Sequence, residues 1–389
     1  MIKVLRRLFV IKVIFLFTLT FFLVNSHIGE FNPIYRTLYD VWYNLLSTLT
    51  KISSLNFGDL FYLILLFIFF YFLLKRNKLR RRDYILRLIL FVMVIYNSFY
   101  WSWGFNYQYP INSKQTTFDY NSSDLKETLD YYLKKTNQYH LQITKSKNKT
   151  VETDLTFNEI SEMCTSYFTR STQFKDFKVN KSYFSEIISY LGFTGYINPI
   201  TLESNINYNI PVISLPTTIS HEIAHQIGYS SESEANYYAI KSTISNKNNF
   251  IKYSGSLLAL QYIISELQYT DSDYLKLKLS EINKGVIENI EEKRKFNLKY
   301  KNPIEPYIKK LYDIFLKKNN QVYGIRSYNM VVNLLIEDYY QSKIKTSKLD
   351  SNWFLSLDIF FSILSNSFVK FWSINFAFSK LFICIVVGP

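Results

Sequence analysis

The sequence predicts a mainly helical α+β fold, in which N-terminal transmembrane helices precede a separate folded domain. Three observations support this prediction. Long apolar runs fill much of the first hundred positions, basic residues flank these runs, and from about residue 104 to 350 apolar residues recur at the spacing of amphipathic helices. Since 48% of the 389 residues are hydrophobic and 20% are charged, the composition excludes both a disordered chain and a wholly embedded one.

The membrane anchor is expected to occupy residues 1–103. It contains three apolar runs, each close to the roughly 20 residues that a helix needs to cross a bilayer. The runs cover about residues 8–24, 57–74 and 84–103. No small-residue cleavage site follows the first run, so we interpret it as a retained helix and not as a signal peptide.

Basic residues predict how the anchor is oriented. Much of the net charge of +14 lies beside the apolar runs, at Lys3, Arg6, Arg7, Lys75, Arg76, Lys78, Arg80, Arg81 and Arg82. Because basic flanks stay in the cytoplasm, the loop at about residues 25–56 and everything after residue 103 should be extracytoplasmic. We therefore expect a multi-pass protein of the cell membrane whose partner is the lipid bilayer. Nucleic acid is not an expected partner, since no binding motif accompanies the charge.

One extracytoplasmic domain is expected over residues 104–350. Leu125, Leu129 and Leu133 recur every four residues, which predicts an amphipathic helix over residues 122–136. Further helical spacing follows beyond residue 250, so the domain should be largely α-helical.

Two other segments have less regular patterns. Residues 197–215 combine prolines with β-prone residues, which predicts a loop and an extended strand leading into a helix. The strand at about residues 205–214 could pair with an extended peptide by strand addition. The apolar tail, residues 351–389, could hold a further span or an interfacial helix.

The clearest chemical signal is His221-Glu222-Ile223-Ala224-His225, which uses two of only four histidines in the chain. Residues four apart lie on one face of a helix, so both imidazoles can reach a single metal ion. Glu222 would lie beside a metal-bound water and could accept its proton, because zinc lowers the pKa of such a water toward about 7.

A zinc site with an open position needs a third protein ligand. Gly228 can end the motif helix in a left-handed conformation, and Ser230 or Ser231 can cap a new helix, with Glu234 completing a capping box to Ser231. If Glu234 is occupied in this way, Glu232 is freer to bind the metal, and Asn236 can hydrogen-bond a ligand. We favour Glu232 and keep Glu234 as the alternative third ligand.

The pair of motifs His221-Glu222-x-x-His225 and Glu232-x-x-Ala235-Asn236 resembles the zincin metallopeptidases with a glutamate third ligand, the gluzincins. In that group the second motif commonly reads Glu-x-x-Ala-Asp. This chain departs from the pattern at Asn236 and in the very short spacer after His225. The resemblance implies a zincin-like metallopeptidase domain with Zn²⁺ as its cofactor.

A longer resemblance covers most of the chain. It rests on Gly195-Tyr196-Ile197-Asn198-Pro199, Leu215-Pro216-x-Thr218-Ile219-Ser220-His221-Glu222-x-Ala224-His225-Gln226-x-Gly228, Glu232-x-Glu234-Ala235-Asn236, Tyr253-Ser254-Gly255 and Gly324-Ile325-Arg326-Ser327-Tyr328. These segments look like an uncharacterised bacterial membrane family, domain of unknown function 3810. The resemblance implies N-terminal spans and a predicted zincin-like domain, and it supports the architecture more than any substrate.

These expectations combine into a membrane-anchored zinc metallopeptidase that hydrolyses peptide bonds in protein or cell-wall peptide with a Glu222-activated, zinc-bound water. Tyr328 is the expected donor to the oxyanion of the reaction, with Arg326 and Tyr253 as further candidates. A non-catalytic, metal-stabilised receptor or scaffold is the alternative. A transporter is disfavoured, because the few charged residues of the apolar runs lie near their ends.

Overall fold

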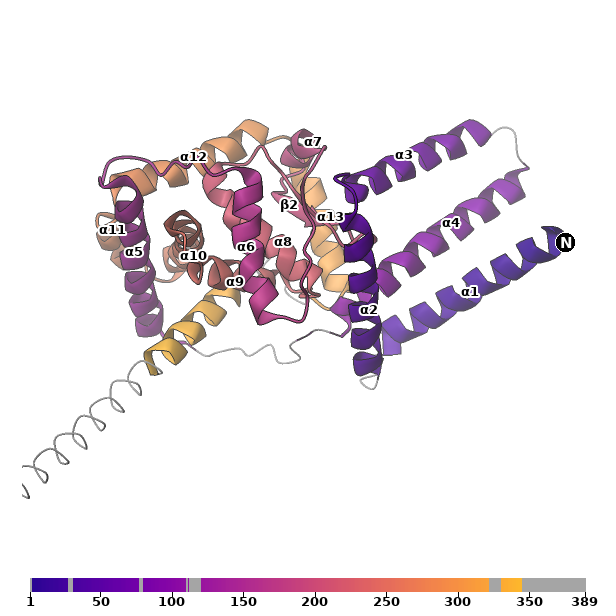
Figure 1. The fold of residues 1–389 in the computed structure, drawn as a ribbon, viewed down its shortest axis with the longest axis horizontal. Helices are drawn as coiled ribbons and strands as arrows, with labels where there is room; N and C mark the ends of the chain where they lie inside the picture. Colours follow the sequence, from indigo (N-terminus) through magenta and orange to yellow (C-terminus); the bar gives the residue numbers. More distant parts are fainter. Residues whose placement is uncertain are drawn as a thin grey trace, which may run out of the picture. The chain divides into compact units, whose positions relative to one another are not determined.

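The computed structural model describes residues 2–26, 31–76, 80–109, 111, 120–321 and 330–344. The described chain is mainly helical, as predicted, and includes a small three-stranded sheet (Figure 1). It divides into two compact units, residues 1–335 and 336–389, so the expected boundary near residue 103 falls inside the first unit. Residues 330–344 are helical, and the expected apolar tail lies outside the described residues.

Three helices are long and apolar enough to cross a membrane. They are α1 (Ile2–Ser26), α3 (Phe57–Lys75) and α4 (Arg81–Ser102). These helices coincide with the three predicted spans. Figure 1 shows them running side by side away from the rest of the chain. Many of their large apolar side chains are exposed, which a bilayer favours and water disfavours.

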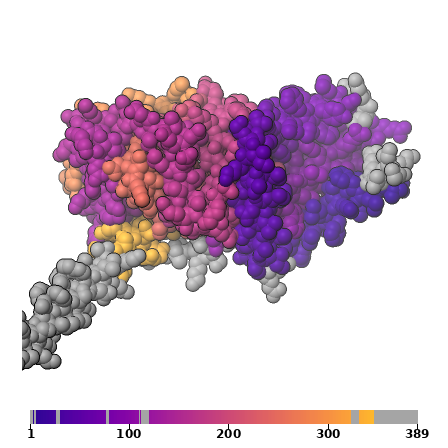
Figure 2. Space-filling view, viewed as in Figure 1, coloured from indigo at the N-terminus to yellow at the C-terminus, as the bar shows by residue number. Residues whose placement is uncertain are grey.

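Helix α2 (Phe31–Lys51) occupies the segment that the sequence was expected to leave as a loop. Tyr35, Tyr39 and Tyr43 recur every four residues and are fully buried against the domain. The opposite face carries exposed apolar residues, which are Ile34, Leu38, Val41, Leu45 and Leu49. Figure 2 shows α2 as a ridge between the membrane helices and the domain. One face of α2 thus packs against the domain, and the other presents apolar side chains to the outside of the protein.

The domain consists mainly of helices that surround α8 (Leu215–Gln226). The other helices are α5 (Ser122–Thr144), α6 (Phe157–Ser171), α7 (Ser185–Tyr190), α9 (Glu232–Ile244), α10 (Asn249–Thr270), α11 (Ser272–Leu279), α12 (Lys284–Tyr300) and α13 (Glu305–Lys318), with the 3₁₀ turns η1 (Gly104–Tyr107) and η2 (Val212–Ser214). In α5, Leu125, Leu129 and Leu133 are buried, which confirms the predicted amphipathic helix.

The sheet contains β1 (Val179–Lys181), β2 (Gly195–Ile197) and β3 (Ser204–Ile206) in the order β1-β3-β2. Strand β3 is parallel to β1 and antiparallel to β2, with Asn205 opposite both Asn180 and Tyr196. The expectation that this segment could receive an extended peptide is therefore wrong, because both edges of β3 are already paired. The free edges of the sheet belong to β1 and β2.

A buried carboxylate attaches the first turn of α3 to the sheet. Asp59 is fully buried and accepts hydrogen bonds from the hydroxyl of Ser182, the backbone N–H of Tyr183 and the hydroxyl of Tyr196 on β2. The side chain of Asn56 caps the same turn by accepting from the N–H of Asp59. Because Tyr196 belongs to an edge strand, the position of that strand depends on a membrane helix.

Replacing Asp59 by alanine should destabilise the protein markedly. Four donors would lose their acceptor, namely the side chains of Asn56, Ser182 and Tyr196 and the backbone N–H of Tyr183. This loss costs on the order of 3 kcal/mol and lowers the melting temperature by roughly 5 °C. Differential scanning fluorimetry of detergent-solubilised protein measures this shift. The matched control is Asp83→Ala, since Asp83 is an exposed acid in the first turn of α4. Equal shifts in melting temperature for the two variants would show that the hydrogen bonds of Asp59 contribute nothing to stability.

Candidate metal centre

Helix α8 carries the His-Glu-x-x-His motif through the middle of the domain. Pro216 lies in its first turn, where a missing amide proton breaks no helical hydrogen bond. Every residue of α8 except His221 is buried, and the helix contacts α6, α9, α10 and the sheet. A helix enclosed in this way holds its side chains in fixed directions, which a binding site requires.

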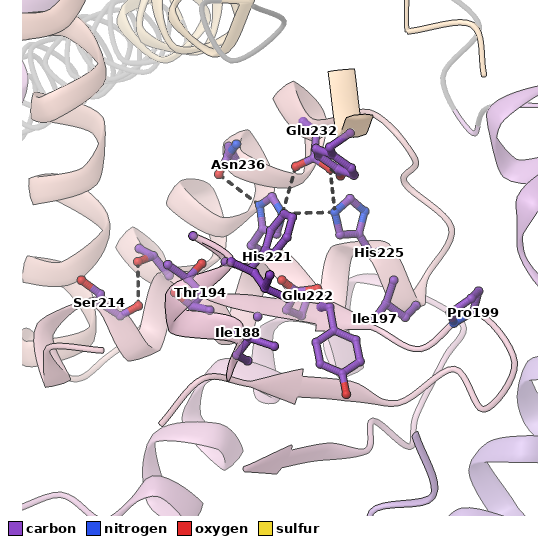
Figure 3. Close-up of a pocket in the computed structure, with 18 of the residues that line it drawn as sticks. Ile188, Thr194, Ile197, Pro199, Ser214, His221, Glu222, His225, Glu232 and Asn236 are labelled. Carbon is purple, nitrogen blue, oxygen red and sulfur yellow. Dashed lines mark hydrogen bonds and ion pairs between the residues drawn. The ribbon is translucent and has the colours of Figure 1, made fainter. Parts of the chain in front are cut away.

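The turn after α8 brings a carboxylate to the two histidines, as the third side chain of the group. Gly228 has a φ of +99°, and a Cβ at this position would lie 2.7 Å from Oδ1 of Asn106, so both backbone conformation and space require glycine. This confirms the prediction that Gly228 ends the motif segment in a left-handed conformation. Helix α9 then begins at Glu232, which faces His221 and His225 (Figure 3).

Three side chains present ligand-type atoms to one point. The Nε2 atoms of His221 and His225 are 3.1 Å apart. Glu232 places Oε2 3.3 Å from Nε2 of His221 and Oε1 3.7 Å from Nε2 of His225. Among the described residues, these three form a group that could hold a metal ion. Tetrahedral zinc with bonds of about 2.0–2.1 Å sets its ligand atoms roughly 3.4 Å apart, so the observed separations fit this ion.

The outer nitrogen of each imidazole ring is held by an acceptor. Nδ1 of His221 lies 3.0 Å from Oδ1 of Asn236, and Nδ1 of His225 lies 2.6 Å from the backbone oxygen of Tyr229. Because both partners accept, each neutral ring carries its proton on Nδ1 and keeps the lone pair on Nε2. This is the arrangement of metal-ligating histidines, and it confirms that Asn236 hydrogen-bonds one of the proposed ligands.

The charges of His221, His225 and Glu232 oppose the effect of burial on the pKa values of these side chains. Burial lowers the pKa of His225 to about 4, whereas at His221 the hydrogen bond and charge of Glu232 outweigh burial and raise the pKa. Burial would raise the pKa of Glu232, but its contacts with the two histidines bring it to about 2. Glu232 is therefore an anion at neutral pH, as a metal ligand must be.

Glu222 lies next to this group on α8 but does not belong to it. Burial raises the pKa of its carboxyl to about 7, against the opposing effect of His221. Its Oε2 atom is buried and has no hydrogen-bond partner among the described residues. Gly195 on β2 leaves room for this carboxyl, since a Cβ there would lie 2.9 Å from Oε1 of Glu222. A buried acid with an unpaired oxygen is suited to exchanging a proton with a bound molecule.

A cavity of about 830 Å³ gives access to these side chains. His221, Glu222, His225 and Glu232 line it together with all of β2. Much of the remaining wall is aromatic or aliphatic, and it includes Tyr62, Phe99, Trp103, Tyr107, Phe184, Ile188, Leu258, Tyr262, Tyr312 and Phe315. A polar reaction group in a largely apolar cavity of this size is typical of a ligand-binding site.

The end of α8 is fixed by aromatic residues from the anchor region, which sequence reasoning missed. The indole N–H of Trp103, directly after α4, donates to the backbone oxygen of His225 over 2.9 Å. On α2, Tyr39 donates to the backbone oxygen of Gln226 over 2.7 Å, and Tyr43 donates to its side-chain oxygen over 3.1 Å. Trp103 and Tyr39 thus donate to backbone carbonyls in the last turn of α8, and Tyr43 fixes the Gln226 side chain. The four-residue spacing of the tyrosines was the available signal.

Tyr312 on α13 was also missed. Its hydroxyl donates to Oε1 of Glu232 over 2.6 Å, and the side chain lines the cavity. The sequence offered no signal for it, because Tyr312 is one of 33 tyrosines and lies 80 residues from its partner.

Two expectations about α9 have different outcomes. Glu234 lies outside the group of three, so the structure brings Glu232 to the histidines and not the alternative acid. Ser231 does occupy the N-cap, but the expected capping box is wrong, since its side chain makes no capping hydrogen bond. The reason is local, because the Ser231 hydroxyl instead lies 2.7 Å from that of Ser233.

Tyr253, one of the expected oxyanion donors, does not line the cavity. Tyr253 is buried in α10, where its hydroxyl donates to Oδ1 of Asn289 over 3.0 Å. Tyr328 and Arg326 lie outside the described residues. The role of Tyr328 therefore stays a prediction.

These features define a helical protein with three apolar helices and a buried His-His-Glu group. The chain belongs to the family described as "Protein of unknown function (DUF3810)", whose model matches residues 35–336. The match extends from α2 to beyond α13 and confirms the longer resemblance read from the sequence. No curated protein and no solved structure matches the chain.

Replacing Glu222 by glutamine should stabilise chelator-treated protein at high pH. The pKa of Glu222 is about 7 in the folded protein and about 4.5 when unfolded, so wild-type protein loses stability as pH rises through this interval. Glutamine does not titrate, and the variant should gain about 3 kcal/mol over wild type at pH 8.5 but little at pH 4.5. Thermal melts in EDTA at both pH values measure the gain.

The control for this experiment is Glu162→Gln, at an exposed acid of α6. It should change stability equally at both pH values. A Glu222→Gln gain that does not depend on pH would contradict the elevated pKa.

Proposed function

We propose that the protein is a membrane-anchored, zinc-dependent metallopeptidase in which Glu222 activates water for attack on a peptide bond. The observation that carries the proposal is the convergence of His221, His225 and Glu232 at separations suited to a tetrahedral cation. The resemblance of the two motifs to the gluzincins supports the same assignment. The proposal extends to a zincin-like domain with Glu232 as the third ligand.

The reaction would use the side chains in distinct roles. Zinc, when bound, supplies a Lewis acid and lowers the pKa of water toward about 7. Glu222 accepts the proton of the attacking water through its unpaired Oε2 and then delivers it to the leaving amine. Its raised pKa favours this exchange near neutral pH. Asn236 and Tyr312 hold His221 and Glu232 in position.

Strand β2 is suited to hold an extended peptide in the cavity. One of its edges pairs with β3, and Gly195, Tyr196 and Ile197 all line the cavity beside Glu222. A peptide pairing with the other edge would gain backbone hydrogen bonds and pass its carbonyls close to the metal group. We therefore propose strand addition at β2 instead of at residues 205–214.

The basic residues support an extracytoplasmic position for the domain. The first turn of α3 is bonded to the sheet through Asp59, so Lys75 and Arg76 lie at the far end of this span. Arg81 and Arg82 begin α4, whose opposite end meets His225 through Trp103. Basic charge thus gathers at the ends of the spans away from the domain, and such ends stay in the cytoplasm.

Purified protein should hold about one zinc ion, and Glu232 should matter more for its affinity than Glu234. Glu232→Gln removes a ligand and should weaken binding beyond the roughly 10–100-fold that loss of an outer partner such as Asn236 costs. Glu234→Gln is the matched control and should leave the affinity nearly unchanged. Competition with a fluorescent zinc chelator compares the affinities of both variants with that of the wild type. Greater loss in Glu234→Gln would assign the third ligand to Glu234.

Glu222→Gln should abolish peptide cleavage while it retains zinc. Removal of the general base should lower kcat/KM by about 10²–10⁴-fold, measured on a quenched fluorogenic peptide library with reconstituted protein. Glu234→Gln again serves as the control and should cleave normally. Cleavage that is absent from wild type, or equal in Glu222→Gln, would contradict the proposal. A zinc-loaded protein without activity would instead be a metal-stabilised receptor or scaffold.

A further inference from the structure

The cavity that contains the metal group is walled in part by the membrane helices themselves. Tyr62 lies on α3 and Phe99 lies on α4, both within candidate spans, and both line the cavity. Trp103, directly after α4, lines it too and donates to the backbone oxygen of His225. A single indole ring therefore separates the end of a span from a residue of the metal group.

Helices α7 and α13 carry exposed apolar side chains beside this wall. On α13, Tyr307, Leu311 and Ile314 are exposed along one face, and Phe315 continues from this face into the cavity. On α7, Ile187 is exposed at the cavity in the same way. Large apolar side chains of this kind are unfavourable in water and favourable at a membrane surface.

Helix α2 marks the level of that surface. Its exposed face is a row of aliphatic side chains, and its buried tyrosines hold the end of the motif helix. Figure 1 shows α2 crossing the ends of the membrane helices where they meet the domain. An amphipathic helix in this position lies in the plane of the interface. Tyr39 of α2 donates to the backbone oxygen of Gln226, the last residue of α8. One side chain therefore connects α2, at the level of this surface, to the end of α8.

We propose that the substrate is a peptide segment of a molecule anchored in the same bilayer, cleaved close to its anchor. This inference rests on the proposed peptidase function and adds the substrate class. The exposed side chains of Ile187 on α7 and of Tyr307, Leu311 and Ile314 on α13 form an apolar rim beside the cavity. The anchor of the substrate can be a transmembrane helix or an acyl chain, since both hold the peptide at this rim. A peptide arriving from bulk water gains nothing from that rim, whereas an anchored one is already concentrated at the cavity.

The distance between anchor and scissile bond provides the test. One cleavable peptide is presented to reconstituted protein in phosphatidylcholine–phosphatidylglycerol vesicles, either free, palmitoylated or fused to a transmembrane helix. Each anchored form carries a spacer of three residues, of ten Gly/Ser residues or of ten prolines. A spacer of ten prolines holds the scissile peptide bond about 30 Å from the bilayer, whereas the flexible Gly/Ser spacer lets the scissile bond return to the membrane surface.

Both anchored forms with the short spacer should be cleaved at least about tenfold faster than the free peptide. The flexible spacer should keep most of this gain, and the proline spacer should lose it. Equal rates with the two long spacers would mean simple concentration on vesicles and would overturn the inference. A gain with only one anchor type would restrict the substrate to that type.

A substitution on the rim distinguishes an effect on the approach of an anchored substrate from an effect on peptide-bond hydrolysis itself. Leu311 is 64% exposed on α13 and does not line the cavity, so Leu311→Asp should leave cleavage of the free peptide unchanged. It should slow cleavage of anchored peptides about fivefold, because a carboxylate is repelled from the bilayer. The matched control is Leu277→Asp on α11, which is 72% exposed and lies away from the membrane helices (Figure 1). Equal effects of the two variants would contradict the inference.

A readout without catalysis distinguishes this inference from the proposed function. Of the two native cysteines, Cys164 is buried in α6, and Cys384 is replaced by serine so that it cannot be labelled. In this background, Leu311→Cys and Leu277→Cys are labelled with a fluorophore in vesicles that contain nitroxide lipids. Quenching at position 311 and not at 277 places the rim in the bilayer. The same quenching without cleavage of any peptide would reject the peptidase assignment. Cleavage of the free peptide without quenching would reject the membrane approach and leave the peptidase standing.

Discussion

The site depends on the turn that folds α9 back against α8. Gly228, in a backbone conformation that other residues rarely adopt, lets the chain reverse between His225 and Glu232. The reversal converts two histidines on one helix into a group with a carboxylate from the next helix. Without it, the imidazole rings would face an apolar cavity with no charge to complete a coordination sphere. The short spacer that departs from the gluzincin pattern is thus the feature that brings Glu232 to the site.

Hydrogen bonds from the helix pair itself and from α2, α13 and the residue after α4 stabilise the buried charge at this turn. Asn236 and the backbone of Tyr229 hold the histidines, Tyr312 holds Glu232, and the anchor-side residues Trp103 and Tyr39 hold the end of α8. Of the two carboxylates at the site, Glu222 is the one that keeps a buried oxygen without a hydrogen-bond partner among the described residues. Its raised pKa means that the fold gives up stability at a position suited to proton transfer, a trade common at reactive sites. The region of the three apolar helices and the candidate metal centre are therefore one connected structure.

Local patterns predicted much of this arrangement. Apolar runs gave the three membrane helices, the spacing of Leu125, Leu129 and Leu133 gave α5, and the His-Glu-x-x-His spacing gave the shared face of the two imidazoles. What the sequence could not supply were contacts between distant segments. Tyr312 and Trp103 reach the site only through tertiary packing, and short strands such as β3 have too few residues for a periodic signal. Helix α2 was missed although its tyrosines follow a helical period, because a short link between spans was taken for a loop.

X-ray absorption at the zinc edge of purified protein tests the central claim most directly. The account predicts about four nitrogen and oxygen ligands near 2.0–2.1 Å, with scattering from two imidazole rings that falls to one ring in His221→Ala. Absence of bound zinc, a sulfur shell near 2.3 Å, or imidazole scattering that survives the substitution would contradict it.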